Sequence, residues 1–142
     1  MSRYRHKSFD PSSVVENAQR APKKKKYQAD HTYADFGFEQ QLYQNILDHG
    51  FERPTPIQDQ IMPAIMQQRD VIGSANTGTG KTAAFLIPLI NNLLHDESRR
   101  VLIMTPTREL AQQIDAEFKL FAKNLKRYST VCIGGTSIRK QI

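Results

Sequence analysis

The sequence predicts an α/β fold in which a parallel sheet carries helices on both faces. Three short apolar runs, at 71–72, 101–104 and 129–133, alternate with segments whose apolar residues recur at helical spacing. Each run contains consecutive apolar residues without polar alternation, as do strands covered on both sides; in the third these are Val131, Cys132 and Ile133. A glycine-rich turn joins the first run to a helix start. We therefore expect the loops to meet beyond the carboxyl ends of the strands and to form one shared site.

The first two helices are predicted from apolar spacing and from their end signals. One is expected over Phe38–His49, followed by Gly50 as a left-handed stop. The next begins at Pro56, because Thr55 suits the N-cap and Gln58 completes a capping box.

Two more helices follow the glycine-rich turn. One is expected over Lys81–Leu94, and another begins near Arg108. Prolines at 63 and 88 are expected to bend the second and third helices.

The segment 75–82 has the composition of a phosphate-binding loop. Gly78 and Gly80 let backbone N–H groups approach phosphate oxygens, and Lys81 adds a mobile cation at a helix start. Thr82 then places its hydroxyl on Mg²⁺. An alanine opens the segment where the usual pattern has glycine. We predict a nucleotide site; the alternative is a glycine-containing helix start with an exposed lysine.

Positive charge is concentrated at the N-terminus. The chain of 142 residues has a net charge of +6, and residues 1–30 hold eight Lys and Arg against three acids. Because this stretch has little periodic apolar content, we expect a disordered basic tail over 1–30 and a folded region over 31–142. The tail is expected to hold nucleic-acid phosphates or to act as a targeting patch; a solubilising arm is the alternative.

Composition limits the remaining classes. A hydrophobic content of 39% supports one modest core at this length. No apolar stretch suits a signal peptide or a membrane span, so we expect an intracellular protein, cytoplasmic or, in a eukaryote, nuclear. The single cysteine, Cys132, excludes an internal disulfide and a cysteine-rich zinc site, and its apolar neighbours predict a buried strand residue.

Four segments, in this order, resemble motifs of the DEAD-box family of ATP-dependent RNA helicases. Residues 50–58, GFERPTPIQ, are similar to the family's adenine-recognising segment, and Tyr33 stands seventeen residues before its glycine, where the family has a lone aromatic. Residues 75–82 match the family's phosphate-loop variant AxTGxGKT. The segment PTRELA at 106–111 is similar to its first RNA-contact motif, and 134–135 to its double-glycine motif.

The resemblance covers about residues 33–142 and implies the N-terminal portion of a RecA-like P-loop NTPase domain. The family's Asp-Glu-Ala-Asp box, its Ser-Ala-Thr motif and its second RecA-like domain are expected beyond Ile142. We therefore interpret the chain as a truncated first helicase domain, either a shortened product or an incomplete reading frame. Hydrolysis by this chain alone is not expected, because the acids that hold Mg²⁺ and orient water are not evident.

The resemblance also implies residue roles for ATP, Mg²⁺ and RNA. Gln58 is expected to read the adenine edge and Tyr33 to stack on its face. Lys81 and Thr82 are the expected catalytic residues, on the β- and γ-phosphates and on the metal. The predicted nucleotide site is Tyr33, Arg53, Gln58, Ala75, Asn76, Thr77, Gly78, Thr79, Gly80, Lys81 and Thr82. The predicted RNA site is Pro106, Thr107, Arg108, Gly134 and Gly135.

Several alternatives stay open. Gln58 also suits a helix cap, and the two roles are compatible. Tyr33 also suits packing beside Phe36 and Phe38, and the double glycine also suits a strand end. The predicted parent protein is a monomeric RNA-dependent ATPase that locally unwinds or clamps single-stranded RNA or short duplexes through backbone contacts. The rivals are another phosphate-loop enzyme, such as a small kinase or GTPase, and a nucleotide- and RNA-binding scaffold without turnover.

Overall fold

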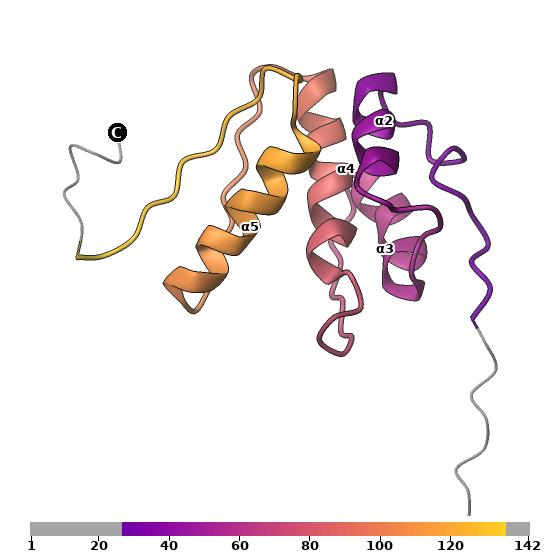
Figure 1. The fold of residues 1–142 in the computed structure, drawn as a ribbon, viewed down its shortest axis with the longest axis horizontal. Coiled ribbons are helices and arrows are strands. Elements are labelled where there is room, and N and C mark those ends of the chain that lie inside the picture. The colour runs from indigo at the N-terminus through magenta and orange to yellow at the C-terminus, as the bar shows by residue number, and fades with distance from the viewer. Residues whose placement is uncertain (1–26, 136–142) are drawn as a thin grey trace, which may run out of the picture.

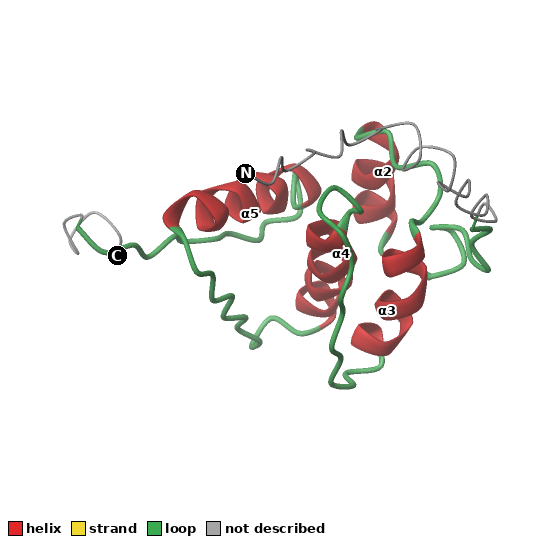
Figure 2. Cartoon of the chain, turned by 90° about the horizontal axis from the view of Figure 1, so that it is seen from below, coloured by secondary structure: helices red, strands yellow, loops and turns green. Residues whose placement is uncertain are grey.

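The computed structural model describes residues 27–135, which contain four α-helices (Figure 1). Residues 1–26, most of the predicted basic tail, and residues 136–142 lie outside the described part. The helices are α2 (Gln40–Asp48), α3 (Pro56–Met66), α4 (Lys81–His95) and α5 (Arg108–Phe121). α4 is central, with α3 packed on one side and α5 on the other (Figures 1 and 2). Within this part of the chain no helix is long and apolar enough to span a membrane.

All four predicted helices are confirmed close to their expected bounds. α2 ends before Gly50, whose φ of +78° is left-handed. α3 begins at Pro56, and the Oε1 atom of Gln58 accepts a hydrogen bond from the backbone N–H of Thr55 at 2.8 Å, as a capping box requires. The side chain of Thr107 caps the start of α5.

The core lies where the apolar faces of the helices meet the aromatic segment that precedes α2. Full burial of one large side chain, such as Leu42 of α2 or Ile90 of α4, contributes about 1.5–3 kcal/mol. The buried members of the core are Tyr33, Phe36, Phe38, Leu42, Ile46, Met62, Ala83, Leu86, Ile87, Ile90, Ile114, Phe118, Phe121 and Ala122.

The predicted sheet is absent from residues 27–135, so that part of the α/β prediction is wrong for this structure. Side chains of the first two apolar runs are exposed, with Ile72 at 102%, Leu102 at 84% and Met104 at 83%, whereas Val131 and Ile133 of the third run are half-buried. Cys132 is also exposed, not buried. Apolar composition identifies residues that suit a covered strand. A parallel strand is held by hydrogen bonds to segments elsewhere in the chain, and local composition does not supply them.

An open cavity of about 1010 Å³ lies between α4, α5 and the two later apolar runs. Leu89 and Leu93 of α4 and Ile114 of α5 face it, together with residues 101–105 and 128–132. The helices thus turn an apolar side toward the runs without closing on them. This space explains how segments with strand composition remain exposed beside a formed helical core.

Asparagine side chains connect helix ends to neighbouring helices. The Nδ2 atom of Asn45, which is 1% exposed, donates to the backbone carbonyls of Phe121 at 2.7 Å and Lys123 at 2.8 Å. These carbonyls are at the end of α5, where the helix leaves acceptors unsatisfied. Asn91 accepts from the backbone at the start of α2, and Asn92 donates to the backbone near the end of α3. Apolar periodicity does not predict these contacts.

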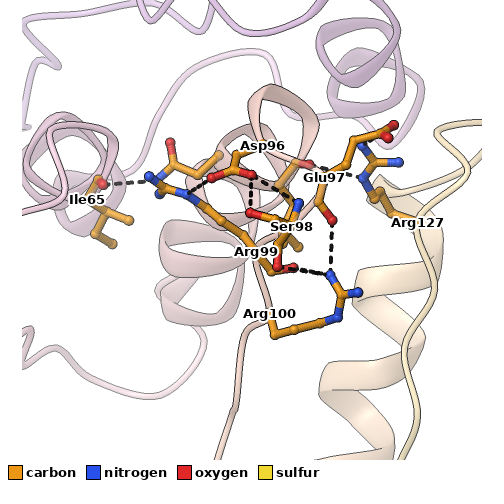
Figure 3. Close-up of polar contacts among 9 residues, drawn as sticks. Ile65, Asp96, Glu97, Ser98, Arg99, Arg100 and Arg127 are labelled. Carbon is orange, nitrogen blue, oxygen red and sulfur yellow. Dashed lines mark hydrogen bonds and ion pairs between the residues drawn. The ribbon is translucent and has the colours of Figure 1, made fainter.

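A charged cluster joins the end of α4 to the chain after α5 (Figure 3). Asp96 accepts from the backbone N–H of Ser98 at 3.0 Å and from the Nε of Arg99 at 3.1 Å. Hydrogen bonds from Ser98, and then from Arg99, lower the pKa of Asp96. Arg127 lies 3.5 Å from Glu97. Because these arginines already contact acids, the cluster has a structural role.

Asn45→Ala is expected to destabilise the chain by about 1–3 kcal/mol, because two carbonyls at the end of α5 lose their donor in a buried place. Urea unfolding followed by circular dichroism measures this. The matched control is Gln44→Ala, an exposed neighbour on α2 whose side chain donates to Asp48 on the same helix. Equal free energies of unfolding for the two variants would contradict the role of Asn45.

Candidate functional site

The side chain of Gln58, in the first turn of α3, is the centre of the candidate site. It is 0% exposed. Its Oε1 atom accepts from the Tyr33 hydroxyl at 2.6 Å and from the Thr55 backbone N–H at 2.8 Å, and its Nε2 atom donates to the Gly80 carbonyl at 3.1 Å. One amide therefore joins the upstream aromatic, the start of α3 and the glycine-rich loop.

The glycine-rich loop lies against the start of α3. Gly78 and Gly80 have φ values of +75° and +82°, in the left-handed region that favours glycine. The hydroxyl of Thr55 donates to the Thr79 carbonyl at 2.8 Å. A Cβ atom on Gly80 would lie 2.5 Å from the Nε2 atom of Gln58. Gly80 is therefore required both by its backbone angle and by the close approach of Gln58.

The ammonium group of Lys81 folds back over the loop that precedes it. The Nζ atom donates to the carbonyls of Ala75 and Asn76, each at 2.6 Å. Lys81 and Thr82 are both half-buried at the start of α4. A cation held by two carbonyl dipoles stays close to the loop, where an anion can take the place of these carbonyls.

The ring of Tyr33 is 1% exposed and packs against Phe36 and Phe51 with centroid distances of 6.3 Å to each. Burial raises the pKa of its hydroxyl, which therefore remains protonated and donates to Gln58. The structure therefore shows Tyr33 packed in the core, which is the alternative role considered for it. Stacking of Tyr33 on a base stays a prediction. Arg53, also predicted for this pocket, is exposed.

Asp59, which sequence reasoning missed, joins the chain before Tyr33 to α3. It is 4% exposed and accepts from the Tyr27 hydroxyl, from the Asp30 backbone N–H and from both the backbone and the ring of His31. Burial acts to raise the pKa of Asp59, but these hydrogen bonds outweigh it, and the pKa lies below its ordinary value. The only local signal was an acid in a first helical turn.

These contacts also bear on the predicted tail. Residues 27–30 were assigned to it, yet Tyr27 and Asp30 are held by Asp59. In the described structure the anchored part of the chain therefore begins earlier than residue 31.

The predicted RNA residues form a second group. Arg108 is the first residue of α5, and Thr107 is its N-cap. A Cβ atom on Gly135 would lie 3.2 Å from the Nη2 atom of Arg108, and one on Gly134 would lie 3.8 Å away. The guanidinium therefore lies directly beside the double glycine. Pro106 is exposed next to this group.

The structure thus gathers most of the predicted residues into two groups, one around Gln58 and one around Arg108. The cavity between α4, α5 and the two later apolar runs is separate from both the phosphate loop and Gln58, because neither of them lines it. Within residues 27–135 no three His, Cys, Asp or Glu side chains form a group that could hold a metal ion. Metal binding through Thr82 stays a prediction.

Comparisons with known proteins show which family the sequence resembles. The model of the DEAD/DEAH box helicase family matches residues 55–142. The DEAD-box ATP-dependent RNA helicase RhpA of Helicobacter pylori is 46% identical over 111 residues, which are 78% of this chain and 22% of that protein. The chain thus spans about a fifth of that relative's length.

Two solved structures are similar in fold. The RNA-helicase Prp28 from Chaetomium thermophilum, bound to ADP, gives a TM-score of 0.71 at 37% identity, over 81% of this chain and 30% of that one. A DEAD box protein from Methanococcus jannaschii gives a TM-score of 0.68 at 32% identity, over 78% of this chain and 31% of that one.

Gly80→Ala is expected to lower the free energy of unfolding by about 1–2 kcal/mol more than Gly78→Ala, because only the first substitution displaces a hydrogen-bonded amide. Both glycines have left-handed φ values, so the backbone penalty is shared. Thermal unfolding without nucleotide measures the difference. Equal melting temperatures for the two variants would mean that Gln58 does not constrain the loop.

Proposed function

Because the chain belongs to the DEAD/DEAH box helicase family, we propose that it forms part of the first RecA-like domain of an ATP-dependent RNA helicase. In this proposal the three apolar runs pair as strands of a parallel α/β sheet, with α4 and α5 as crossover helices. The observation that carries the proposal is the Gln58 network, because it joins the predicted adenine-reading residue to the phosphate loop.

The nucleotide site is proposed to bind ATP between Gln58 and the loop 75–82. An amide offers a donor and an acceptor, as the adenine edge does, so Gln58 suits that base. The bond of Gln58 to Gly80 then exchanges for a bond to the base. The contact with Thr55 keeps the amide oriented meanwhile.

We propose that phosphate oxygens of ATP replace the carbonyls of Ala75 and Asn76 as hydrogen-bond partners of the Lys81 ammonium. An ammonium–phosphate contact is a charge-assisted pair and is stronger than one with neutral carbonyls, so the exchange is favourable. Backbone N–H groups of the loop and the start of α4 add anion stabilisation. Mg²⁺, when bound, would neutralise charge on the phosphates, and the Thr82 hydroxyl is the group of this loop that would hold it.

RNA is proposed to bind at the second group. Arg108 holds a phosphate, and the missing side chains of Gly134 and Gly135 let a strand of nucleic acid approach the backbone. Such contacts do not read sequence. ATP binding is proposed to close two lobes on single-stranded RNA or a short duplex, and hydrolysis to reopen them. We further propose that the chain works as a monomer. Hydrolysis is proposed to need acidic residues that hold Mg²⁺ and orient water and that are not evident in this chain.

Lys81→Ala is expected to weaken ATP binding by this chain about 100-fold, because the loop loses its cation. Calorimetry measures binding, with Lys119→Ala, an exposed lysine of α5, as control. RNA-stimulated hydrolysis by the complete gene product, and its loss on the same substitution, tests the enzyme proposal. If both proteins bind ATP and neither hydrolyses it, a scaffold is favoured. A preference for guanine nucleotides would favour another phosphate-loop enzyme.

Arg108→Ala is expected to lower RNA affinity and to reduce the slope of log affinity against log salt by about one, since one phosphate contact is lost. Fluorescence anisotropy with labelled single-stranded RNA over a salt series measures both. The control is Arg100→Ala, which removes an equal charge from the loop between α4 and α5. A loss of ATP binding in the Arg108 variant would contradict the assignment of Arg108 to the RNA site.

A further inference from the structure

The segment 27–31, which we call the N-terminal strap, is tied to α3 through one carboxylate. The Oδ2 atom of Asp59 accepts from the Tyr27 hydroxyl at 2.6 Å and from the Asp30 backbone N–H at 2.9 Å. Its Oδ1 atom accepts from the His31 backbone N–H at 3.2 Å and lies 2.7 Å from the His31 Nδ1 atom. Bonds to an ionised acceptor are stronger than neutral ones, so this acid holds an otherwise exposed strap.

The strap acts on the same helical turn that carries the centre of the site. Asp59 directly follows Gln58, and the two side chains are 4% and 0% exposed. Asp59 holds the strap up to His31, and Gln58 contacts Tyr33 two residues later. Between them, the backbone N–H and hydroxyl of Thr32 donate to the Asp35 carboxylate at 2.6 and 2.7 Å and close a turn. The strap therefore holds the chain two residues before Tyr33, and together with the packing of the Tyr33 ring on Phe36 and Phe51 it positions the hydroxyl.

The Tyr33 hydroxyl and two backbone groups together hold the Gln58 amide in one orientation. The Thr55 N–H can only donate and the Gly80 carbonyl can only accept, so these two select which end of the amide is oxygen, and the Tyr33 hydroxyl donates to that same oxygen. The nitrogen is then left facing Gly80 and the phosphate loop. A rotated amide would present oxygen there instead. Adenine and guanine carry different donor and acceptor patterns on their edges, so amide orientation decides which base is favoured.

We propose that Asp59 is a positioning residue for adenine selection, which acts through the strap and Tyr33 to fix the orientation of the Gln58 amide. This inference rests on the proposed function, in which Gln58 reads the base. The groups that donate to Asp59 are the Tyr27 hydroxyl, the Asp30 backbone N–H, and the backbone and ring of His31. Asp59 itself touches no nucleotide in this scheme.

The test is Asp59→Asn in the 142-residue chain, with ATP, GTP and inorganic tripolyphosphate titrated by calorimetry. The amide keeps the shape of the acid but loses its charge and half of its acceptor capacity. ATP affinity is expected to fall about five- to tenfold, while GTP and tripolyphosphate affinities stay within about twofold. Asp48→Asn is the control, because it removes the same charge from α2, where Asp48 accepts from Gln44.

A merely structural Asp59 would lower the melting temperature and weaken all three ligands alike. That result, or an unchanged ratio of ATP to GTP affinity in the folded variant, overturns the proposal. If Asp59→Asn does not fold, the double variant Tyr27→Phe, His31→Ala decides, since it removes two donors of the exposed strap and leaves α3 intact. Its ratio of ATP to GTP affinity must fall.

Gln58→Ala, measured in parallel, separates this inference from the proposed function. If that variant keeps the full preference for ATP over GTP, Gln58 does not read the base, and both proposals are overturned. If Gln58→Ala lowers the preference and Asp59→Asn does not, only the positioning role of Asp59 is overturned.

Discussion

The buried amide of Gln58 is the interaction on which the site depends. A buried amide without partners carries a large desolvation cost, so its three contacts constrain one another. The partners come from the segment before α2, from the start of α3 and from the turn before α4. A change at any one of them must be accommodated by the other two. Local geometry is therefore shared across segments that are distant in sequence.

The loop 75–82 shows how the same constraint prepares a site for an anion. Its left-handed glycines let it pass close to Gln58, and its carbonyls retain the Lys81 ammonium. Those carbonyls are weaker partners for the cation than phosphate oxygens. In the proposed function, the loop therefore keeps the Lys81 ammonium close to the phosphates, and ATP binding exchanges its carbonyl partners for phosphate oxygens.

The features that the sequence predicted are those with local causes. Apolar spacing and end signals gave four helices, and the capping box at Thr55 and Gln58 formed as expected. The strands did not form, because their hydrogen bonds are non-local. Asp59 and Asn45 were missed for a related reason: a buried polar residue is recognised by its partners, which lie 28 to 32 and 76 to 78 positions away. Tyr33 was placed beside Gln58, but its burial depended on the aromatic residues packed around it.

The two groups of functional residues rest on different parts of the molecule. The Gln58 network lies at the contact between α3 and α4, and that contact belongs to the formed helical core. The Arg108 group joins the start of α5 to residues 134–135, which follow the run at 129–133. The packing of α3 on α4, together with the segment before α2 and the turn before α4, therefore fixes the Gln58 network. The Arg108 group also depends on where the run at 129–133 lies, and in the proposed function that run is a strand of the sheet.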